Sequence, residues 1–241
     1  MLGLLHADGH YDKQHTNGKI TLEASMKDVD IAHKLSKVLP GKSTITYRNR
    51  HTNYSKDSQT FVWSIYDKDI RTQFPMPSGK KSHLIAPPDI PYSKVDYWRG
   101  IIDGDGSLGF TSQGLPFISL VTQSEALKET YIDFLEPILG YRKRLSRNTR
   151  DNVYNIVIFN EAAQSLANKL YYLDCLAIAR KYEVANQLKQ WERSIPQRPR
   201  SLPWEQWEEQ YLQTHTLDEA IKYLSHRTKK AIKLKHYRIS G

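Results

Sequence analysis

The chain has 241 residues, enough for one large domain or for two smaller domains that each have a core. Its formal net charge of +9 favours a polyanionic partner, either nucleic acid or an anionic membrane surface. No apolar run approaches the roughly 18 residues of a membrane helix, and the N-terminus lacks a signal pattern, so a membrane role is disfavoured. Cys175 is the single cysteine, which excludes an intrachain disulfide and fits a reducing compartment. We therefore expect a cytoplasmic protein of a prokaryote or phage, with an organellar matrix or stroma as the alternative.

The chain carries two copies of one short motif. Leu2–Gly9 reads LGLLHADG and Arg99–Gly106 reads RGIIDGDG. From the second position on, both contain a small residue, two apolar residues, any residue, a small residue, aspartate and glycine. Such an internal repeat predicts two copies of one structural unit, with one site built from both copies.

The spacing within each motif predicts a short helix that packs against its copy. Gly3 and Ala7 are four residues apart, as are Gly100 and Gly104, so each pair lies on one face of a helix. Small residues on a shared face allow two helix backbones to approach closely. We expect the final glycine of each motif to end its helix in a positive-φ conformation.

Packing of the two helices side by side would bring Asp8 and Asp105 together at the helix C-termini. Unpaired carbonyl groups and the negative end of each helix dipole lie there too, so the carboxylates repel each other unless a cation joins them. Hard oxygen ligands of this kind suit Mg²⁺.

Two other metal sites fit the motifs less well. A calcium loop beginning at Asp103 needs glycine at its sixth position and glutamate at its twelfth, where the chain has Leu108 and Gly114. His6 and His10 have the spacing of a helical zinc pair, but the intervening Gly9 would end the helix between them.

Strands and helices are expected to alternate after each motif. The first half is predicted to contain a strand at 20–24, a helix at 29–39, a hairpin of 43–50 with 59–65, a short helix at 67–74, and a linker at 75–93. The second half is predicted to contain strands at 108–111 and 116–122, a helix at 125–139, a hairpin of 141–147 with 153–159, and helical residues at 161–191 broken near Leu173. This order predicts an α+β fold with two repeats, 1–92 and 93–195, each of the order helix-strand-strand-helix-strand-strand-helix with one antiparallel sheet.

A small all-α module is predicted at 201–241, after a second proline-rich linker at 194–203. Its first helix covers 204–213, the second opens with a capping box at Thr216–Glu219, and the third covers 228–239. The arrangement resembles a Myb-like helix-turn-helix, whose basic last helix would enter the major groove of DNA. The alternative, a solvated basic tail, is disfavoured by the capping box and by apolar residues at helical spacing. The DNA-binding candidates in this helix are Lys229, Lys230, Lys233, Lys235 and Arg238.

Basic and amide side chains occur at equivalent places in the two predicted hairpins. Two-stranded ribbons fit the major groove, where Arg reads guanine and Asn reads adenine. A solvated charged face is the alternative, and the equivalence of the two positions favours DNA. The candidates are Arg48, Arg50 and Asn53 in the first hairpin, and Arg142, Lys143, Arg144 and Arg147 in the second.

The paired motifs resemble those of the LAGLIDADG homing endonucleases in their monomeric, two-repeat form, and the resemblance extends over about residues 1–195. His6 stands where the family usually has an acidic residue, at a position that is not the metal ligand. The resemblance implies a monomer that makes a double-strand break in a long DNA target, with Mg²⁺ or another divalent cation such as Mn²⁺. It also implies a role in intron or intein mobility.

The resemblance also implies roles for individual residues. Asp8 and Asp105 would bind metal, one for each DNA strand, with help from the carbonyl groups of Ala7 and Gly104. Lys81 and Lys181 match the basic residues of the family's two active-site pockets, with simple phosphate contact as the alternative, and Gln123 matches a residue that orders water. The counterpart of Gln123 in the first repeat falls at Ser25 or Met26, so the two half-sites could differ in chemistry.

Two other functions remain open on the same fold. One is a regulator that binds DNA without cutting it, which the presence of both aspartates and both lysines disfavours. The other is an intron maturase that binds RNA, for which the sequence offers no specific support.

Overall fold

The computed structural model describes residues 1–11, 18–39, 41–52, 55–74, 82–193 and 204–240; of residues 50–52, 55–57, 73 and 240 it describes the backbone only. The chain divides into two compact units, Met1–Glu192 and Arg193–Gly241, and both repeats of the motif lie in unit 1. Over the described residues, no helix is long and apolar enough to cross a membrane.

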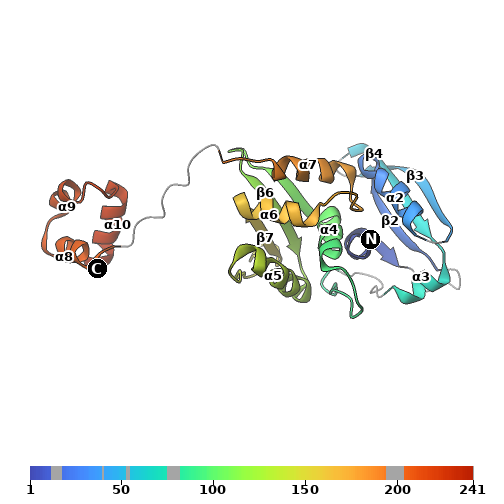
Figure 1. Ribbon diagram of the computed structural model, residues 1–241, viewed down its shortest axis with the longest axis horizontal. Helices are drawn as coiled ribbons and strands as arrows, with labels where there is room; N and C mark the ends of the chain where they lie inside the picture. The colour runs from blue at the N-terminus through green and yellow to red at the C-terminus, as the bar shows by residue number, and fades with distance from the viewer. Residues whose placement is uncertain (12–17, 40, 53–54, 75–81, 194–203, 241) are drawn as a thin grey trace. The chain divides into compact units, whose positions relative to one another are not determined.

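The first repeat builds a four-stranded antiparallel sheet (Figure 1). It contains α1 (Leu2–Asp8), β1 (Gly9–Tyr11), β2 (Ile20–Ser25), a 3-10 turn η1 (Met26–Asp28), α2 (Asp30–Val38), β3 (Ser43–Thr52), β4 (Ser55–Ile65) and α3 (Lys68–Gln73). The strands lie in the order β1-β2-β4-β3, so the β3–β4 hairpin joins the sheet through β4. The predicted hairpin is confirmed, and its strands run closer to the tip than expected.

The second repeat follows the same order with one strand fewer. It contains α4 (Lys94–Gly104), β5 (Gly106–Phe110), β6 (Pro116–Thr122), α5 (Glu125–Leu139), β7 (Tyr154–Phe159), α6 (Asn160–Leu170) and α7 (Ala179–Lys189). The strands lie in the order β5-β6-β7. Gly140 ends α5 at φ +74°, and the predicted break in the long helical segment lies between α6 and α7.

The predicted strand at 141–147 is wrong. The Arg142 guanidinium forms ion pairs with three carboxylates of α5, those of Glu129, Asp133 and Glu136. The segment then turns back at Asn148, whose N–H donates to the Val153 carbonyl over 2.8 Å. Because its side chains bond to α5 and its backbone bonds to itself, this segment forms no ladder with β7.

Each sheet packs its helices on one face. In the second repeat, Ile118, Leu120, Ile156 and Ile158 form one core with residues of α4, α5 and α6. In the first repeat, residues of β2 and β4 pack against α1 and α2. Alternate strand residues therefore point away from the helices, and we call those the outer face of each sheet.

The final glycines of the motifs do not have the expected positive φ. Gly9 is extended, at φ −74° and ψ 152°, and begins β1, while Gly106 begins β5. Their role is steric instead. A Cβ atom on Gly9 would lie 2.4 Å from the Leu5 carbonyl oxygen, and one on Gly106 would lie 2.7 Å from Ile102 Cα. The chain can therefore turn directly from helix into strand only where no side chain is present.

Unit 2 contains three helices, α8 (Gln206–Thr214), α9 (Leu217–Tyr223) and α10 (Lys229–Ser240), around a small core of Leu212, Ala220, Leu224 and Ile232. The predicted capping box is confirmed, since Thr216 and Glu219 each accept from the other's backbone N–H. A second capping box, of Glu205 and Glu208, opens α8.

Candidate active site

The two motif helices pack with almost no space between their backbones. A Cβ atom on Gly3 would lie 1.9 Å from the Tyr97 carbonyl oxygen, and one on Gly100 would lie 2.5 Å from the Leu4 nitrogen. Near the C-terminal ends, a Cβ atom on Gly104 would lie 2.4 Å from the Ala7 Cβ. The close approach predicted from the small residues is confirmed at three levels along the helices.

This packing brings the two motif aspartates to neighbouring helix ends. Asp8 ends α1 and Asp105 caps α4, and both are exposed. The Asp8 carboxylate lies against the partner helix, because a Cβ atom on Gly104 would stand 3.1 Å from Asp8 Oδ2. Two carboxylates therefore lie at adjacent helix C-termini, where the helix dipoles add further negative potential.

Each aspartate lines a pocket beside its own sheet. The pocket of the second repeat, of about 250 Å³, is lined by Asp105, Ala7, Val121, Gln123 and four further residues. It therefore brings together three of the predicted site residues, and Ala7 comes from the other repeat.

The pocket of the first repeat, of about 280 Å³, is lined by Asp8, His10, Lys19, Thr21, Glu23, Arg48 and Val62. Apart from Asp8, these come from β1, β2, β3 and β4 or, in the case of Lys19, from just before β2. His10, Lys19 and Glu23 were not predicted as site residues. For Lys19 and Glu23, the available signal in the sequence was their alternation with the apolar residues Ile20 and Leu22.

The two pockets differ at equivalent positions. Gly9 pairs with Leu22 and Gly106 pairs with Leu120, so the strand registers place Ser25 at the position of Gln123. The Ser25 hydroxyl accepts from the Lys27 N–H over 3.4 Å and caps η1. Gln123 lines the pocket of the second repeat, whereas Ser25, at the equivalent register position, caps η1 and does not line the pocket of the first repeat.

Lys181 is buried and holds the C-terminal end of α4. Its Nζ atom donates to the carbonyl groups of Ile102, Asp103 and Gly106 over 2.7, 2.6 and 2.8 Å. Burial lowers the pKa of the Lys181 ammonium group. The lysine thus lies beneath the turn that carries Asp105 and supplies hydrogen bonds to the carbonyl groups there. Its predicted counterpart, Lys81, lies outside the described residues.

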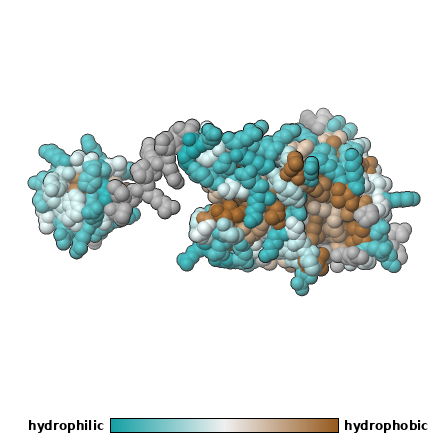
Figure 2. Space-filling view, in the orientation of Figure 1, coloured by the Kyte–Doolittle hydropathy of each residue, from teal (hydrophilic) through white to brown (hydrophobic). Residues whose placement is uncertain are grey.

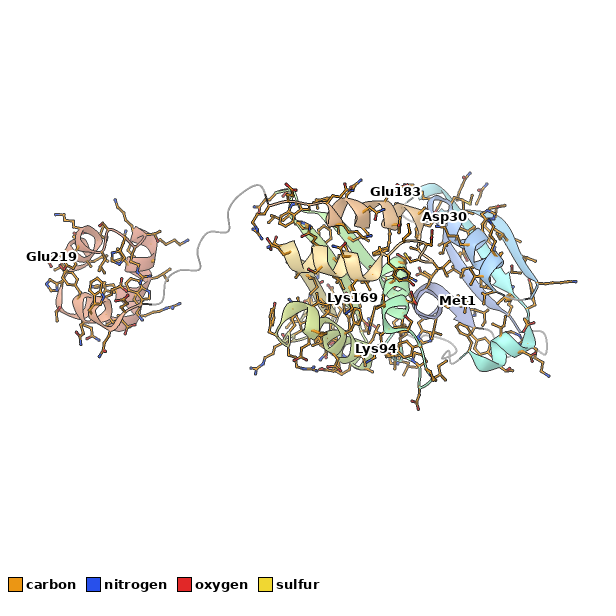
Figure 3. All side chains as sticks on the ribbon, viewed as in Figure 1. Met1, Asp30, Lys94, Lys169, Glu183 and Glu219 are labelled. Atoms are coloured by element: carbon orange, nitrogen blue, oxygen red, sulfur yellow. The ribbon has the colours of Figure 1, made fainter. Side chains whose placement is uncertain are left out.

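The helix that carries Lys181 is fastened to the first repeat. Arg180 donates to both carboxylate oxygens of Asp28 over 3.0 and 2.9 Å. The Ala179 N–H donates over 2.9 Å to Asp30, which Figure 3 shows on α2 beside α7. These contacts link the two repeats on the side of the helices.

Asp103 is a site neighbour that sequence reasoning did not assign. It is buried, accepts from the Tyr171 hydroxyl over 2.7 Å, and accepts from the Ile178 N–H over 3.0 Å. Burial raises the pKa of its carboxyl group to about 6. Asp103 thereby holds the segment between α6 and α7 against α4, and its position inside a charged-looking motif gave no sign of this burial.

The oxygen ligands around the aspartates fit a divalent cation. The Asp8 carboxylate lies beside Gly104 at the end of α4, and none of the three carbonyl groups held by Lys181 belongs to Ala7 or Gly104. Among the described residues there is no group of three or more His, Cys, Asp or Glu side chains that could hold a metal. A metal here would therefore take its remaining ligands from backbone, water or substrate, as Mg²⁺ often does.

The basic residues of the first hairpin lie at the expected sheet. Arg48 is about half exposed on the outer face and lies 3.6 Å from Glu23. Arg50 belongs to β3, but its side chain is not described, and Asn53 lies outside the described residues.

Two of the four predicted basic residues of the second repeat are engaged within the protein. Arg142 is bound to α5, and Arg147 stacks on the Tyr154 ring at 4.4 Å and donates to the Asn152 carbonyl. Lys143 is partly exposed and Arg144 is exposed. The sequence analysis inferred DNA contact from equivalent basic positions in two predicted hairpins. Because the second hairpin does not form, this equivalence does not exist in the fold.

In unit 2, most of the predicted DNA-binding residues are exposed on α10, where Lys229, Lys230 and Lys233 share one face. Lys229, Lys230, Lys233 and Arg238 are exposed, whereas Lys235 forms an ion pair with Glu209 of α8 at 2.6 Å. The visible surface of this unit is largely hydrophilic (Figure 2).

No protein-family model and no curated protein matches this chain. Among solved structures, meganuclease I-SmaMI bound to uncleavable DNA is 13% identical at a TM-score of 0.51, over 78% of this chain and 87% of that one. The homing endonuclease I-WcaI bound to its recognition sequence is 16% identical at a TM-score of 0.48, over 78% of this chain and 83% of that one. The I-LtrWI LAGLIDADG homing endonuclease bound to target DNA is 12% identical at a TM-score of 0.45, over 78% of this chain and 86% of that one. The chain thus shares the fold of meganuclease I-SmaMI.

Proposed function

We propose that the chain is a site-specific endonuclease of the LAGLIDADG homing type, which makes a double-strand break in a long DNA target. The observation that carries this proposal is the placement of Asp8 and Asp105. The glycine contacts of α1 and α4 hold the aspartates at neighbouring helix ends, and each aspartate lines a pocket beside its own sheet. Two equivalent carboxylate sites, one per repeat, suit the cutting of two antiparallel strands.

DNA is the proposed substrate because the charge of the protein and its fold both favour this partner. The net charge of +9 favours a polyanion, and the outer face of the first sheet carries Arg48 beside the Asp8 pocket. The fold shared with a meganuclease that was solved on DNA supports the same conclusion by analogy. Because both repeats belong to one chain, a monomer contains both aspartates.

The proposed metal is Mg²⁺ or Mn²⁺, held by Asp8 and Asp105 with the carbonyl groups of Ala7 and Gly104. When bound, such an ion supplies an activated water and stabilises charge on the phosphate. Gln123 lines the Asp105 pocket and would orient water there. Lys181 would act as a positioning residue, since its bonds hold the turn that carries Asp105.

Unit 2 is proposed as a helix-turn-helix module that adds DNA contacts outside the cut region. The exposed lysines Lys229, Lys230 and Lys233 on one face of α10 would contact the phosphates and base edges of the major groove. We also propose intron or intein mobility as the biological role and the cytoplasm as the compartment.

The test is incubation of the full chain with Mg²⁺ and a randomised duplex library, followed by sequencing of cleaved and bound molecules. Cleavage of one sequence on both strands is the expected result. Selective binding without cleavage would favour a regulator, and selection of no duplex would leave the RNA-binding maturase as the alternative.

A further inference from the structure

The outer faces of the two sheets differ in chemistry. In the first sheet this face includes His10, Glu23 and Arg48, which the strand registers place on the same side as Thr21 and Val62. It is a face of charges and hydroxyl groups, of the kind that makes hydrogen bonds to base edges and phosphates.

The outer face of the second sheet carries no charged side chain along the fully described strands β5, β6 and β7. The registers pair Ser107 with Ser119, Gly109 with Phe117, Phe117 with Phe159, Ser119 with Val157, and Val121 with Asn155. The Phe117 ring lies beneath Gly109, where an added Cβ atom would be 3.6 Å from it. The buried residues that alternate with this set, including Ile118 and Ile156, face the helices instead.

This uncharged face is exposed. Val121 is 47% exposed and Phe159 is 48% exposed, although the residues of β6 and β7 on the other face are buried. The helices α5 and α6 belong to the core on that other face, so they do not cover these residues. Apolar side chains that lie together on an exposed face mark an interaction surface.

The face also runs directly into the candidate active site. Val121 lines the same pocket as Asp105 and Gln123, and Asn155 is the cross-strand partner of Val121. From there, β7 leads away from Asp105 through Val157 to Phe159. A strand rises about 3.3 Å per residue, so Asn155 and Phe159 lie about 13 Å apart. That is close to four base-pair steps of DNA.

We propose that β7 reads an A·T-rich stretch in the target half bound by the second repeat, with Val157 and Phe159 contacting thymine methyl groups and Asn155 contacting adenine. The proposal rests on the proposed function and adds how one half-site is chosen. Apolar side chains recognise the thymine methyl group in the major groove, and Asn pairs with adenine there. Because the outer faces of β5, β6 and β7 carry no arginine or lysine, the commonest partners of guanine are absent from these strands.

The experiment uses the full chain and duplexes selected from the library. Each thymine of the target is replaced in turn by uracil, which removes only the methyl group. At two positions in one half-site, we expect the replacement to weaken wild-type binding about fourfold. This is the change in affinity that corresponds to the burial free energy of one methyl group. Val157→Ser should abolish the discrimination at the position nearer the cut, and Phe159→Ser at the farther one.

Val38→Ser is the matched control, because Val38 is 63% exposed on α2 and far from this face in the fold. It should leave every thymine-to-uracil ratio unchanged. The proposal is overturned if the selected half-sites are rich in guanine, or if thymine and uracil bind equally at every position. It is also overturned if Phe159→Ser changes the self-association of the free chain and leaves DNA binding unchanged. Failure of the chain to select any duplex would instead defeat the proposed function itself.

Discussion

Gly3 lies so close to Tyr97 that a Cβ atom on the glycine would stand 1.9 Å from the tyrosine carbonyl oxygen. The contact is with backbone, which cannot move aside as a flexible side chain would. This close contact sets the spacing of α1 and α4, and through it the placement of Asp8 and Asp105 at neighbouring helix ends.

Gly3→Ala is therefore expected to lower the free energy of unfolding by about 3 kcal/mol or more, because the helices must separate. Gly109→Ala is the control, since its Cβ atom would make only an ordinary contact, 3.6 Å from the Phe117 ring. Thermal unfolding of the two variants measures the difference. Equal melting temperatures would mean that α1 and α4 are not packed at this distance.

Asp8→Asn and Asp105→Asn are each expected to abolish double-strand cleavage while leaving DNA affinity within a few-fold, because each change removes a charge and little volume. Asp89→Asn, at an exposed residue away from the motifs, is the control. Supercoiled-plasmid cleavage separates nicking from double-strand cutting. Full double-strand cleavage by either site variant would refute the assignment, and nicking of one strand would show two partly independent sites.

Lys181→Met is expected to destabilise unit 1 by about 3 kcal/mol as well as to slow cleavage, because three carbonyl groups, two of them buried, lose a charged donor. Lys94→Met, at an exposed lysine of α4, should do neither. The measurements are chemical denaturation and cleavage rate. Unchanged stability with lost cleavage would indicate that the lysine turns toward DNA and acts there.

The stability of unit 2 is expected to fall in acid through Glu208. This carboxylate is buried, and hydrogen bonds from Arg227 lower its pKa from 4.5 to about 2. A lowered pKa stabilises the folded form fully above about 4.5, and that contribution is lost as the pH falls toward 2.

Hydrogen exchange of the α8 and α10 amides in the full chain, corrected for intrinsic rates, measures this loss. Glu208→Gln should speed exchange at neutral pH and flatten its dependence on acid. Glu219→Gln is the control, because glutamine can still close a capping box on the exposed α9. A Glu208→Gln variant with the acid dependence of the wild type would contradict the prediction.

Deletion of residues 200–241 is expected to weaken DNA binding and to flatten its salt dependence by about 0.9 per lost phosphate contact. The cut positions should stay the same at saturating protein, since both aspartates lie in unit 1. In the full chain, Lys233→Ala should reduce the salt slope more than Lys235→Ala, because Lys235 is paired with Glu209. Equal affinity and slope after deletion would exclude unit 2 from the DNA interface.

The paired helices could be predicted from the sequence because the signal is local. Gly3 and Ala7, like Gly100 and Gly104, share a helix face by spacing alone, and alternating strands beside amphipathic helices identify two antiparallel sheets. The capping box at Thr216 and the helix end at Gly140 are equally local, and both are confirmed.

Only the tertiary structure decided what depends on contacts between distant residues. Three carboxylates of α5 capture Arg142, so the strand expected beside β7 does not form. Lys181 is directed to buried carbonyl groups of α4, and the final motif glycines are needed for close approach to the helix rather than for positive φ. The uncharged outer face of the second sheet emerges only from strand register, since the residues that form it come from three separate strands.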